Sequence, residues 1–458
     1  MAIPDSSLYP LIVFIILIVI FELINGFHDT ANAVATVIYT QTLKPVQAVV
    51  WSGIWNFLGI YIGGIAVASS IMSLLPLSQL ALQPEQITMS IILAILLSAI
   101  IWNFITWFFS LPCSSSHTLI GAMLGAGSAY WYLYGGAGIN FRKAYDIGLS
   151  LLLSPTFGFT LVIIILFIFQ VVVKKKKLLN HAPINKNEKP PFYIRMTLVS
   201  TCTLVSFLHG SNDGQKGIGL IMTLLILVAP MQFTVNETLS KSTIEQTLND
   251  IQSNLMSSQN NSIYTGELEL KAKSIEALKY SFLNENKTLT EKISLRKRFQ
   301  LLKKDLTVIV NDHQIITQRV TRRALKNEIR VVDAYTNYAP KWALLLVALS
   351  LGTGTMIGWK RIVITIGEKI GKTHLTYAQG AASELVAATT IGLSTGFGLP
   401  VSTTHVLSSA VAGSMVAKQG VKNLQKKTVI NIALAWVLTL PVTMGMAVIL
   451  FLIFNYII

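Results

Sequence analysis

Two short motifs, each present twice in the chain, contain the residues whose types and spacing could do chemistry. The first is Gly-Phe-His-Asp at residues 26–29, with Gly-Ser-Asn-Asp at residues 210–213 as its counterpart. The second is Leu-Pro-Cys-Ser-Ser-Ser-His at residues 111–117, matched by Leu-Pro-Val-Ser-Thr-Thr-His at residues 399–405. An acid and a hydroxyl cluster in each half of the chain predict a combined site for a cation and an anion.

The hydroxyl motif predicts an anion-binding helix terminus. Its proline ends one helix or begins the next, so three small hydroxyl residues fall in the first turn that follows. Their hydroxyls and the free backbone N–H groups form a donor cluster at the positive end of the helix dipole. A single copy would indicate only an N-cap, but two facing copies would surround a tetrahedral oxyanion. The expected anion-binding residues are Ser114, Ser115, Ser116, Thr118, Ser402, Thr403 and Thr404.

Charged residues within the apolar segments predict the cation site. A charge at the centre of a membrane helix costs about 2.5–3.5 kcal/mol. Each motif acid follows a glycine by three residues, and we expect the apolar helices to be interrupted there, with exposed backbone groups. The residues expected to couple a cation or proton are Glu22, His28, Asp29, Asp213, Lys216 and Glu384. Three further histidines could carry a proton or be structural, namely His117, His209 and His405.

Electrostatics connects the two kinds of site. An oxyanion close to Asp29 and Asp213 would be repelled unless a proton, Na⁺ or a divalent metal ion lay between them. The sequence therefore predicts transport of an anion together with a cation. No ATPase phosphate loop and no nucleophile–base pair is recognisable, so we expect neither an enzyme nor direct use of ATP. No cofactor and no certain resident metal site is expected.

The composition places these motifs in a multi-pass membrane protein. Of the 458 residues, 52% are hydrophobic and 12% are charged, about half the charged share of a soluble domain. Apolar runs long enough to cross a membrane recur along the chain. The formal charge of +15 lies largely in short loops and in a polar insert, where it indicates cytoplasmic loops and lipid headgroups rather than nucleic acid. We therefore expect an all-α protein of the cell membrane, plasma or inner.

Composition also divides the chain. Residues 1–173 form a first membrane half, 174–195 a basic cytoplasmic linker, 196–230 the start of a second half, 231–339 a polar helical insert, and 340–458 the remainder of the second half. Without the insert, the spacing between the two motifs is nearly equal in both halves, which predicts a repeat of about five spans each. An odd number of spans gives inverted repeats with broken or re-entrant helices, as in secondary transporters.

The motifs resemble the signatures of a known family. Residues 26–36, 209–219 and 400–409 are similar to signatures of the inorganic phosphate transporter (PiT) family, in its bacterial low-affinity type. The resemblance covers nearly the whole chain outside the insert. It implies import of inorganic phosphate, a homodimer, and a site where the paired acid and hydroxyl motifs meet. It also adds Asn32 and Asn212 to the expected phosphate-binding residues.

Departures from the family pattern affect the coupling ion. Many members have Asn-Asp-x-Ala-Asn in both halves, whereas here His28 replaces the first Asn, and Gly-Gln-Lys at residues 214–216 replaces the second tail. These changes remove carbonyl ligands and add a positive charge, and they resemble the branch associated with proton-coupled uptake of metal–phosphate complexes. We expect proton symport of phosphate, alone or with a divalent metal, by alternating access. The alternatives are sodium coupling, another oxyanion such as sulfate, or a receptor or metal channel that works through the insert.

Overall fold

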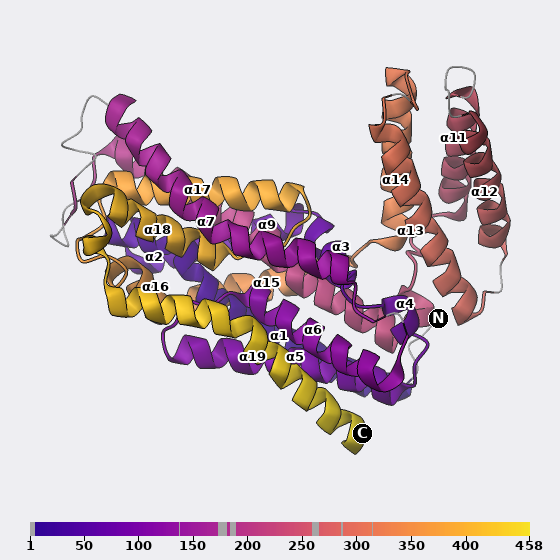
Figure 1. Ribbon diagram of the computed structural model, residues 1–458, viewed down its shortest axis with the longest axis horizontal. Helices are drawn as coiled ribbons and strands as arrows, with labels where there is room; N and C mark the ends of the chain where they lie inside the picture. The colour runs from indigo at the N-terminus through magenta and orange to yellow at the C-terminus, as the bar shows by residue number, and fades with distance from the viewer. Residues whose placement is uncertain are drawn as a thin grey trace. The chain divides into compact units, whose positions relative to one another are not determined.

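Helices make up the regular structure of the chain (Figure 1). The computed structural model describes residues 5–136, 138–172, 181–183, 189–258, 265–284, 287–313 and 315–458. Within these ranges the helices are accompanied by one isolated β-bridge, between Gly371 and Leu424. The expected all-α fold class is therefore confirmed. Much of the expected basic linker at 174–195 lies outside the described residues.

The chain divides into two compact units. The described parts of residues 9–76, 84–224 and 340–458 form one of them, here called the membrane unit. The described parts of residues 1–8, 77–83 and 225–339 form the other, here called the insert unit. Each unit has its own apolar core. The finer domain boundaries expected from composition stay a prediction.

The membrane unit contains the long apolar helices. Its helices are α1 (Asp5–Tyr39), α2 (Pro45–Ile62), α3 (Ala66–Met72), α5 (Glu85–Phe108), α6 (Ser115–Tyr134), α7 (Phe141–Val172), α9 (Phe192–Val228), α15 (Lys341–Ile357), α16 (Lys360–Glu368), α17 (Tyr377–Gly396), α18 (Thr403–Gln419), η2 (Val421–Asn423) and α19 (Lys426–Ile457). Among the described residues 5 helices are long and apolar enough to cross a membrane, or up to 7 with two bent helix pairs. One such pair is α2 and α3, bent by 73°. The multi-pass prediction is confirmed, while the total of about ten spans stays a prediction.

Helices from the two halves of the chain pack against each other. Helix α19 lies against α5 and α6, and α18 lies against α7 and α17 (Figure 1). Helix α15 packs on α2 in the same way. The last helix of each half thus contacts the helix that begins with the hydroxyl motif of the other half. The exchange is the same in both directions, which is compatible with a repeated fold, and the inverted orientation of the repeats stays a prediction.

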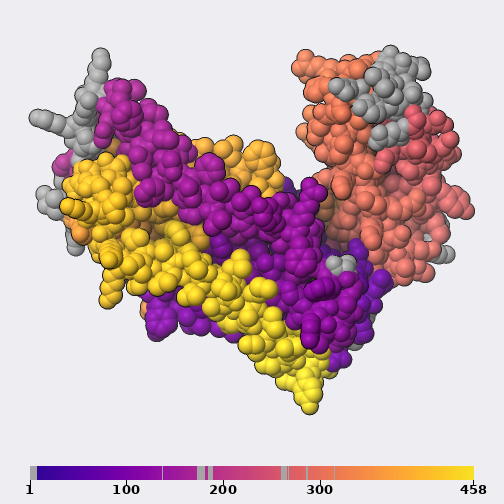
Figure 2. Space-filling view, viewed as in Figure 1, coloured from indigo at the N-terminus to yellow at the C-terminus, as the bar shows by residue number. Residues whose placement is uncertain are grey.

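The outer faces of α7 and α19 carry large apolar side chains. Phe157, Phe167 and Val437 are 59%, 67% and 71% exposed. In the space-filling view both helices run along the surface of the membrane unit (Figure 2). Apolar surface of this extent is unfavourable in water, so these faces fit contact with lipid hydrocarbon. The expected homodimer stays a prediction.

The inward face of α1 is polar over much of its length. Five of its buried polar residues recur every three or four positions and therefore share one side of the helix. They are Glu22, Asn25, Asp29, Asn32 and Thr36. Because these side chains are shielded from water, they need hydrogen-bonding partners inside the membrane unit. This face of α1 is where the candidate site is built.

The insert unit is a small helical assembly. Its helices are α4 (Leu77–Leu80), α10 (Pro230–Phe233), α11 (Lys241–Ser258), α12 (Thr265–Leu283), α13 (Leu289–Asn311) and α14 (Arg319–Thr336). Helix α11 pairs with α12 and α14, and α13 pairs with α14 (Figure 1). A capping box starts α13, in which Thr288 N donates to the Glu291 carboxylate at 2.7 Å and Glu291 N donates to Thr288 Oγ1 at 3.3 Å.

Candidate functional site

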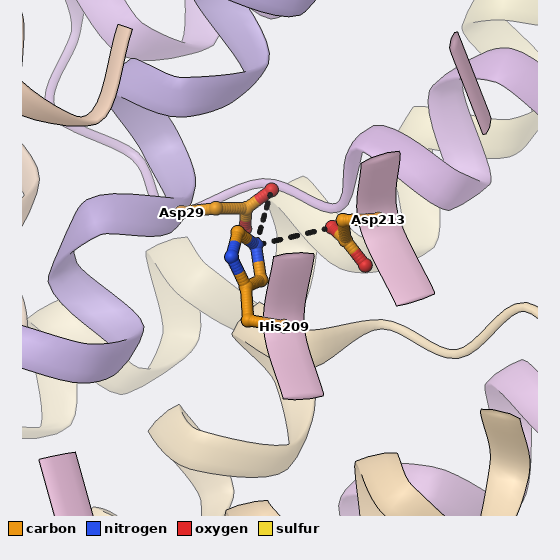
Figure 3. A group of neighbouring side chains, drawn as sticks. All are labelled: Asp29, His209 and Asp213. Carbon is orange, nitrogen blue, oxygen red and sulfur yellow. Dashed lines mark ion pairs between the residues drawn. The ribbon is translucent and has the colours of Figure 1, made fainter. Parts of the chain in front are cut away.

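Two acids and a histidine meet inside the membrane unit (Figure 3). Asp29 lies on α1, while His209 and Asp213 lie one turn apart on α9. The His209 Nε2 atom is 3.5 Å from Asp29 Oδ2 and 3.4 Å from Asp213 Oδ2. The other ring nitrogen, Nδ1, is 2.9 Å from Asn56 Oδ1 on α2, which fixes the orientation of the ring. A protonated His209 is therefore placed to pair with both carboxylates.

The helices that carry the acids are continuous. Helix α1 runs unbroken through Asp29, and α9 runs unbroken through Asp213, so the expected interruption at these acids is wrong. The motif glycines allow close packing instead. A Cβ atom at Gly26 would lie 2.6 Å from the backbone of α15, and one at Gly210 would lie 2.2 Å from the backbone of α2. The glycines therefore allow α15 to pack on α1 and α2 to pack on α9. Side chains of α6, α9 and α18, rather than unwound backbone, contact the acids.

Lys216 gives the site a positive charge. Its side chain is 1% exposed and follows Asp213 by three residues on α9. The Lys216 Nζ atom donates to Asp213 Oδ2 at 2.6 Å and to Ser115 Oγ at 2.9 Å. Ser115 Oγ in turn lies 3.4 Å from Asp29 Oδ2. Since Ser115 begins α6 in the first half of the chain, the ammonium group connects the two halves.

The hydroxyl motifs form helix N-termini, as predicted. Ser114 caps α6 and Ser402 caps α18. The Ser114 Oγ atom accepts from His117 N at 3.2 Å, and Ser402 Oγ accepts from His405 N at 3.1 Å. These two hydroxyls therefore have the ordinary N-cap role. The hydroxyl residues that follow the caps are the ones that contact the acids.

Asp29 is the centre of the hydrogen-bond network. Its Oδ1 atom accepts from Asn32 Nδ2 at 2.8 Å, from Thr404 Oγ1 at 2.7 Å and from Thr403 Oγ1 at 3.3 Å. Thr403 Oγ1 also lies 3.4 Å from Asp213 Oδ2. Hydroxyls that begin α18 thus reach a carboxylate on α1, and the two kinds of repeated motif meet in one place.

Two acceptor atoms of the site lack a partner. Asp213 Oδ1 and Asn32 Oδ1 are buried and accept no hydrogen bond from the described residues. An unpaired buried acceptor costs roughly 1–3 kcal/mol, so both atoms favour a bound cation, and Asp213 Oδ1 could also take up a proton. Asp29, His209 and Asp213 also offer one ligand atom each, all within 4.8 Å of one another. Two carboxylates and an imidazole are a donor set that suits a divalent metal ion.

Three of the expected phosphate-binding residues bond to backbone outside this network. Ser116 Oγ donates to the Val401 carbonyl oxygen at 2.8 Å, and Thr118 Oγ1 donates to the carbonyl oxygen one turn earlier at 2.9 Å. Asn212 Nδ2 donates to the Leu399 carbonyl oxygen at 3.2 Å, and its Oδ1 accepts from Val401 N at 3.4 Å. Asn212 therefore holds the segment between α17 and α18 in place.

Glu22 and Glu384 make separate buried contacts on either side of Asp29 along α1. Glu22 lies two turns before Asp29 and accepts from Asn25 at 3.4 Å. Glu384 of α17 accepts from Thr36, two turns after Asp29, and from a threonine of α9. Seven residues of α-helix span about 10 Å. Each glutamate contact is therefore displaced by about that distance from Asp29 along the axis of α1.

The other three histidines of the repeated motifs lie outside the Asp29–His209–Asp213 cluster. The His28 Nε2 atom is 2.8 Å from the Asn103 carbonyl oxygen of α5. His117 and His405, which end the two hydroxyl motifs, have ring centroids 4.6 Å apart. The Trp436 ring lies 4.1 Å from that of His405. The two hydroxyl motifs therefore also meet through a pair of imidazole rings.

The sequence does not decide the role of His209 and indicates none for Asn56. A signal for His209 is present, because it precedes Asp213 by four residues and so shares a helix face with it. Asn56 had no such signal. Its contact with His209 exists only because α2 packs closely on α9.

The sequence of the chain matches known transporters. Residues 25–447 match the phosphate transporter family. A low-affinity inorganic phosphate transporter of Buchnera aphidicola subsp. Acyrthosiphon pisum is 41% identical over 95% of each chain. The low-affinity inorganic phosphate transporter PitB of Escherichia coli is 39% identical over 93% of this chain and 92% of its own. These matches agree with the resemblance inferred from the motifs.

A solved structure supports the fold. The chain matches a structure described as the sodium-dependent phosphate transporter with a TM-score of 0.58, over 98% of this chain and 100% of that one. The sequence identity is 20%. At that identity the match shows the shared fold, and the chemistry must be argued from the residues.

Proposed function

Because the chain belongs to the phosphate transporter family, we propose that it imports inorganic phosphate across the cell membrane in symport with protons. The observation that carries the proposal is the contact of the Ser115, Thr403 and Thr404 hydroxyls with the Asp29 carboxylate. This contact puts donors for an anion and acceptors for a cation in one buried site. The relatives are named transporters, which agrees with the expectation that the chain is not an enzyme and favours a carrier over a receptor.

Protonation of the site would free donors for phosphate. Thr403 and Thr404 donate to Asp29 in the structure. When Asp29 or His209 takes up a proton, the negative charge beside these hydroxyls decreases, and they can turn toward a phosphate oxygen. The N-termini of α6 and α18 add free N–H groups and favourable dipoles. Proton and phosphate each favour binding of the other, which is the thermodynamic requirement for symport.

Both halves of the chain supply binding groups, so their relative movement would change access to the site. Asp29 and Ser115 come from the first half, while His209, Asp213 and Thr404 come from the second. Movement of one half against the other would expose the site to each side of the membrane in turn. A net positive load gains about 2.3 kcal/mol per charge per 100 mV of membrane potential, which would drive import into the cell.

A metal–phosphate complex is a second candidate substrate. The observation in its favour is the Asp29, His209 and Asp213 donor set, with ligand atoms within 4.8 Å of one another. A divalent ion that arrives with phosphate would bring the positive charge that the two carboxylates require. In that case uptake of phosphate would depend on the metal as well as on pH.

Uptake of labelled phosphate into proteoliposomes tests the proposal. With an acidic exterior and no sodium, uptake should exceed that of protein-free vesicles, and collapse of the pH gradient should abolish the excess. A sodium gradient at equal pH should add nothing. Uptake that follows sodium and ignores pH would overturn the proton assignment.

Two additions to the same assay define the substrate. Excess sulfate should leave uptake of labelled phosphate unchanged, whereas competition equal to that of unlabelled phosphate would overturn the phosphate assignment. Removal of divalent ions by a chelator should abolish uptake if the metal–phosphate complex is the substrate. Unchanged uptake with the chelator would leave phosphate alone as the substrate.

A further inference from the structure

We propose that the Lys216 ammonium group is a tethered cation, which fills a cation-binding position beside Asp213 and lowers by one the number of free cations that phosphate binding requires. The inference rests on the proposed function, because it concerns the same site. The role of Lys216 in the charge balance of the site is the same whichever free ion is coupled to phosphate. The observation behind it is one buried ammonium group that contacts both halves of the chain.

The contacts of Lys216 Nζ are those that a small bound cation would make. The atom lies 2.6 Å from a carboxylate oxygen of Asp213 and 2.9 Å from the hydroxyl oxygen of Ser115. Burial of the side chain excludes water from these contacts. Removal of the side chain beyond Cβ would therefore leave oxygen ligands around a space that a small cation could enter.

The site has an excess of negative charge without Lys216. Asp29 and Asp213 face each other across His209, the only other base that pairs with them among the described residues. Uncompensated charges are strongly unfavourable in a buried site. A cation must therefore be present before an anion can bind, and Lys216 supplies one that is always there.

A tethered cation differs from a free one in its effect on transport. The lysine ammonium is a compact charge on a flexible stem, and its position three residues after Asp213 places both side chains on one helix face. Because it is covalently attached, it stays with the protein when phosphate is released. It contributes to binding without being transported. The same site without the lysine would need one more free cation for each phosphate.

Variants of Lys216 test the proposal in the proteoliposome assay. Lys216→Ala opens the space, Lys216→Met removes the charge but fills the space, and exposed Lys422→Ala is the matched control. Each is assayed with sodium, methylammonium or the large cation N-methylglucamine outside. We expect Lys216→Ala uptake in N-methylglucamine to be at least about tenfold below wild type, or about 1.4 kcal/mol. Sodium or methylammonium should restore it in a saturable way.

The other variants should behave differently. Lys216→Met should stay inactive in every cation, and Lys422→Ala should match the wild type. Lys216→Ala uptake equal to wild type in N-methylglucamine would overturn the proposal. Failure of both small cations to restore uptake would overturn it as well.

Thermal unfolding in detergent gives a readout that does not require transport. Sodium or methylammonium should raise the Tm of Lys216→Ala in a concentration-dependent way and leave the wild-type Tm unchanged, because only the variant has an open cation position. The absence of this difference would overturn the proposal. A wild-type protein without phosphate uptake would overturn the proposed function alone, since the Tm measurement still tests the role of Lys216.

Discussion

Replacing Asp29 by asparagine would remove one charge from the site with almost no change in shape. The amide oxygen can still accept hydrogen bonds from Asn32 and Thr404. The amide NH₂ group, however, takes the place of the Oδ2 atom that lies 3.5 Å from His209 Nε2. A protonated His209 would then face another donor, so the variant favours the neutral ring. Phosphate would lose the proton that accompanies it.

The size of the effect follows from the ion pair that the variant loses, in which Asp29 Oδ2 lies 3.5 Å from His209 Nε2. Removal of one partner from a buried ion pair costs about 3–5 kcal/mol. The weaker hydrogen bonds from Asn32 and Thr404 do not add to this loss, because a hydroxyl released from Asp29 can turn toward a phosphate oxygen. The lower value, about 3 kcal/mol, corresponds to a loss of uptake on the order of 100-fold.

The assay is the initial rate of labelled phosphate uptake into proteoliposomes across a range of pH. Asp29→Asn should show the predicted loss, and its residual uptake should no longer depend on pH. Asp146→Asn, at an exposed position of α7, is the control and should match the wild type. A loss of less than about fivefold, or about 1 kcal/mol, would refute this reasoning. A residual rate with the wild-type pH profile would also refute it.

Four further predictions concern packing, capping, a hydroxyl of the site and pH. Gly210→Val should abolish the yield of folded protein in detergent, because a Cβ atom at this position would lie 2.2 Å from the α2 backbone. Gly148→Ala is the control and should fold normally, because no heavy atom lies within 4 Å of the added Cβ atom. Ser402→Ala should lower the free energy of unfolding by about 1 kcal/mol, because the N-cap of α18 is lost, and thermal unfolding measures this change. Thr404→Val should reduce phosphate uptake far more than it reduces stability. Burial, with a nearby aspartate, raises the pKa of Glu328 in the insert from 4.5 to about 7, so the folded protein holds a proton that the unfolded chain releases. The stability of the insert should therefore fall as pH rises through this range, by roughly 1 kcal/mol after allowance for solvent screening. Hydrogen exchange of the α11 amides should report this loss of stability, and Glu328→Gln should remove its pH dependence.

Local signals were sufficient to predict much of the site. The capping roles of Ser114 and Ser402 follow from short-range rules for helix N-termini. The meeting of the acid and hydroxyl motifs follows from their repetition, because two halves with the same motifs must bring equivalent helices together. Thr404 of the second hydroxyl motif and Ser115 of the first both contact Asp29, as this repetition predicts.

Features that depend on helix packing could not be predicted. A glycine within an apolar helix is compatible with unwinding or with close approach of a neighbour, and sequence does not distinguish them. At Gly26 and Gly210 the structure shows close approach. Likewise, Glu22 and Glu384 are as buried as Asp29, but only the three-dimensional arrangement shows that they make separate contacts. The role of Asn56 depends on α2 in the same way.

The polar face of α1 alters the dielectric profile that a charge meets within the bilayer. From Glu22 to Thr36 this face extends over about 21 Å of helix, against a hydrocarbon thickness of about 30 Å. Transfer of an ion into a low-dielectric medium costs on the order of 20 kcal/mol, and polar atoms at every helical turn reduce that cost along the way. The insulating part of the membrane beside α1 therefore lies along its N-terminal half, where the buried side chains Leu11, Phe14, Ile18 and Phe21 are apolar. These apolar side chains must provide the electrical seal.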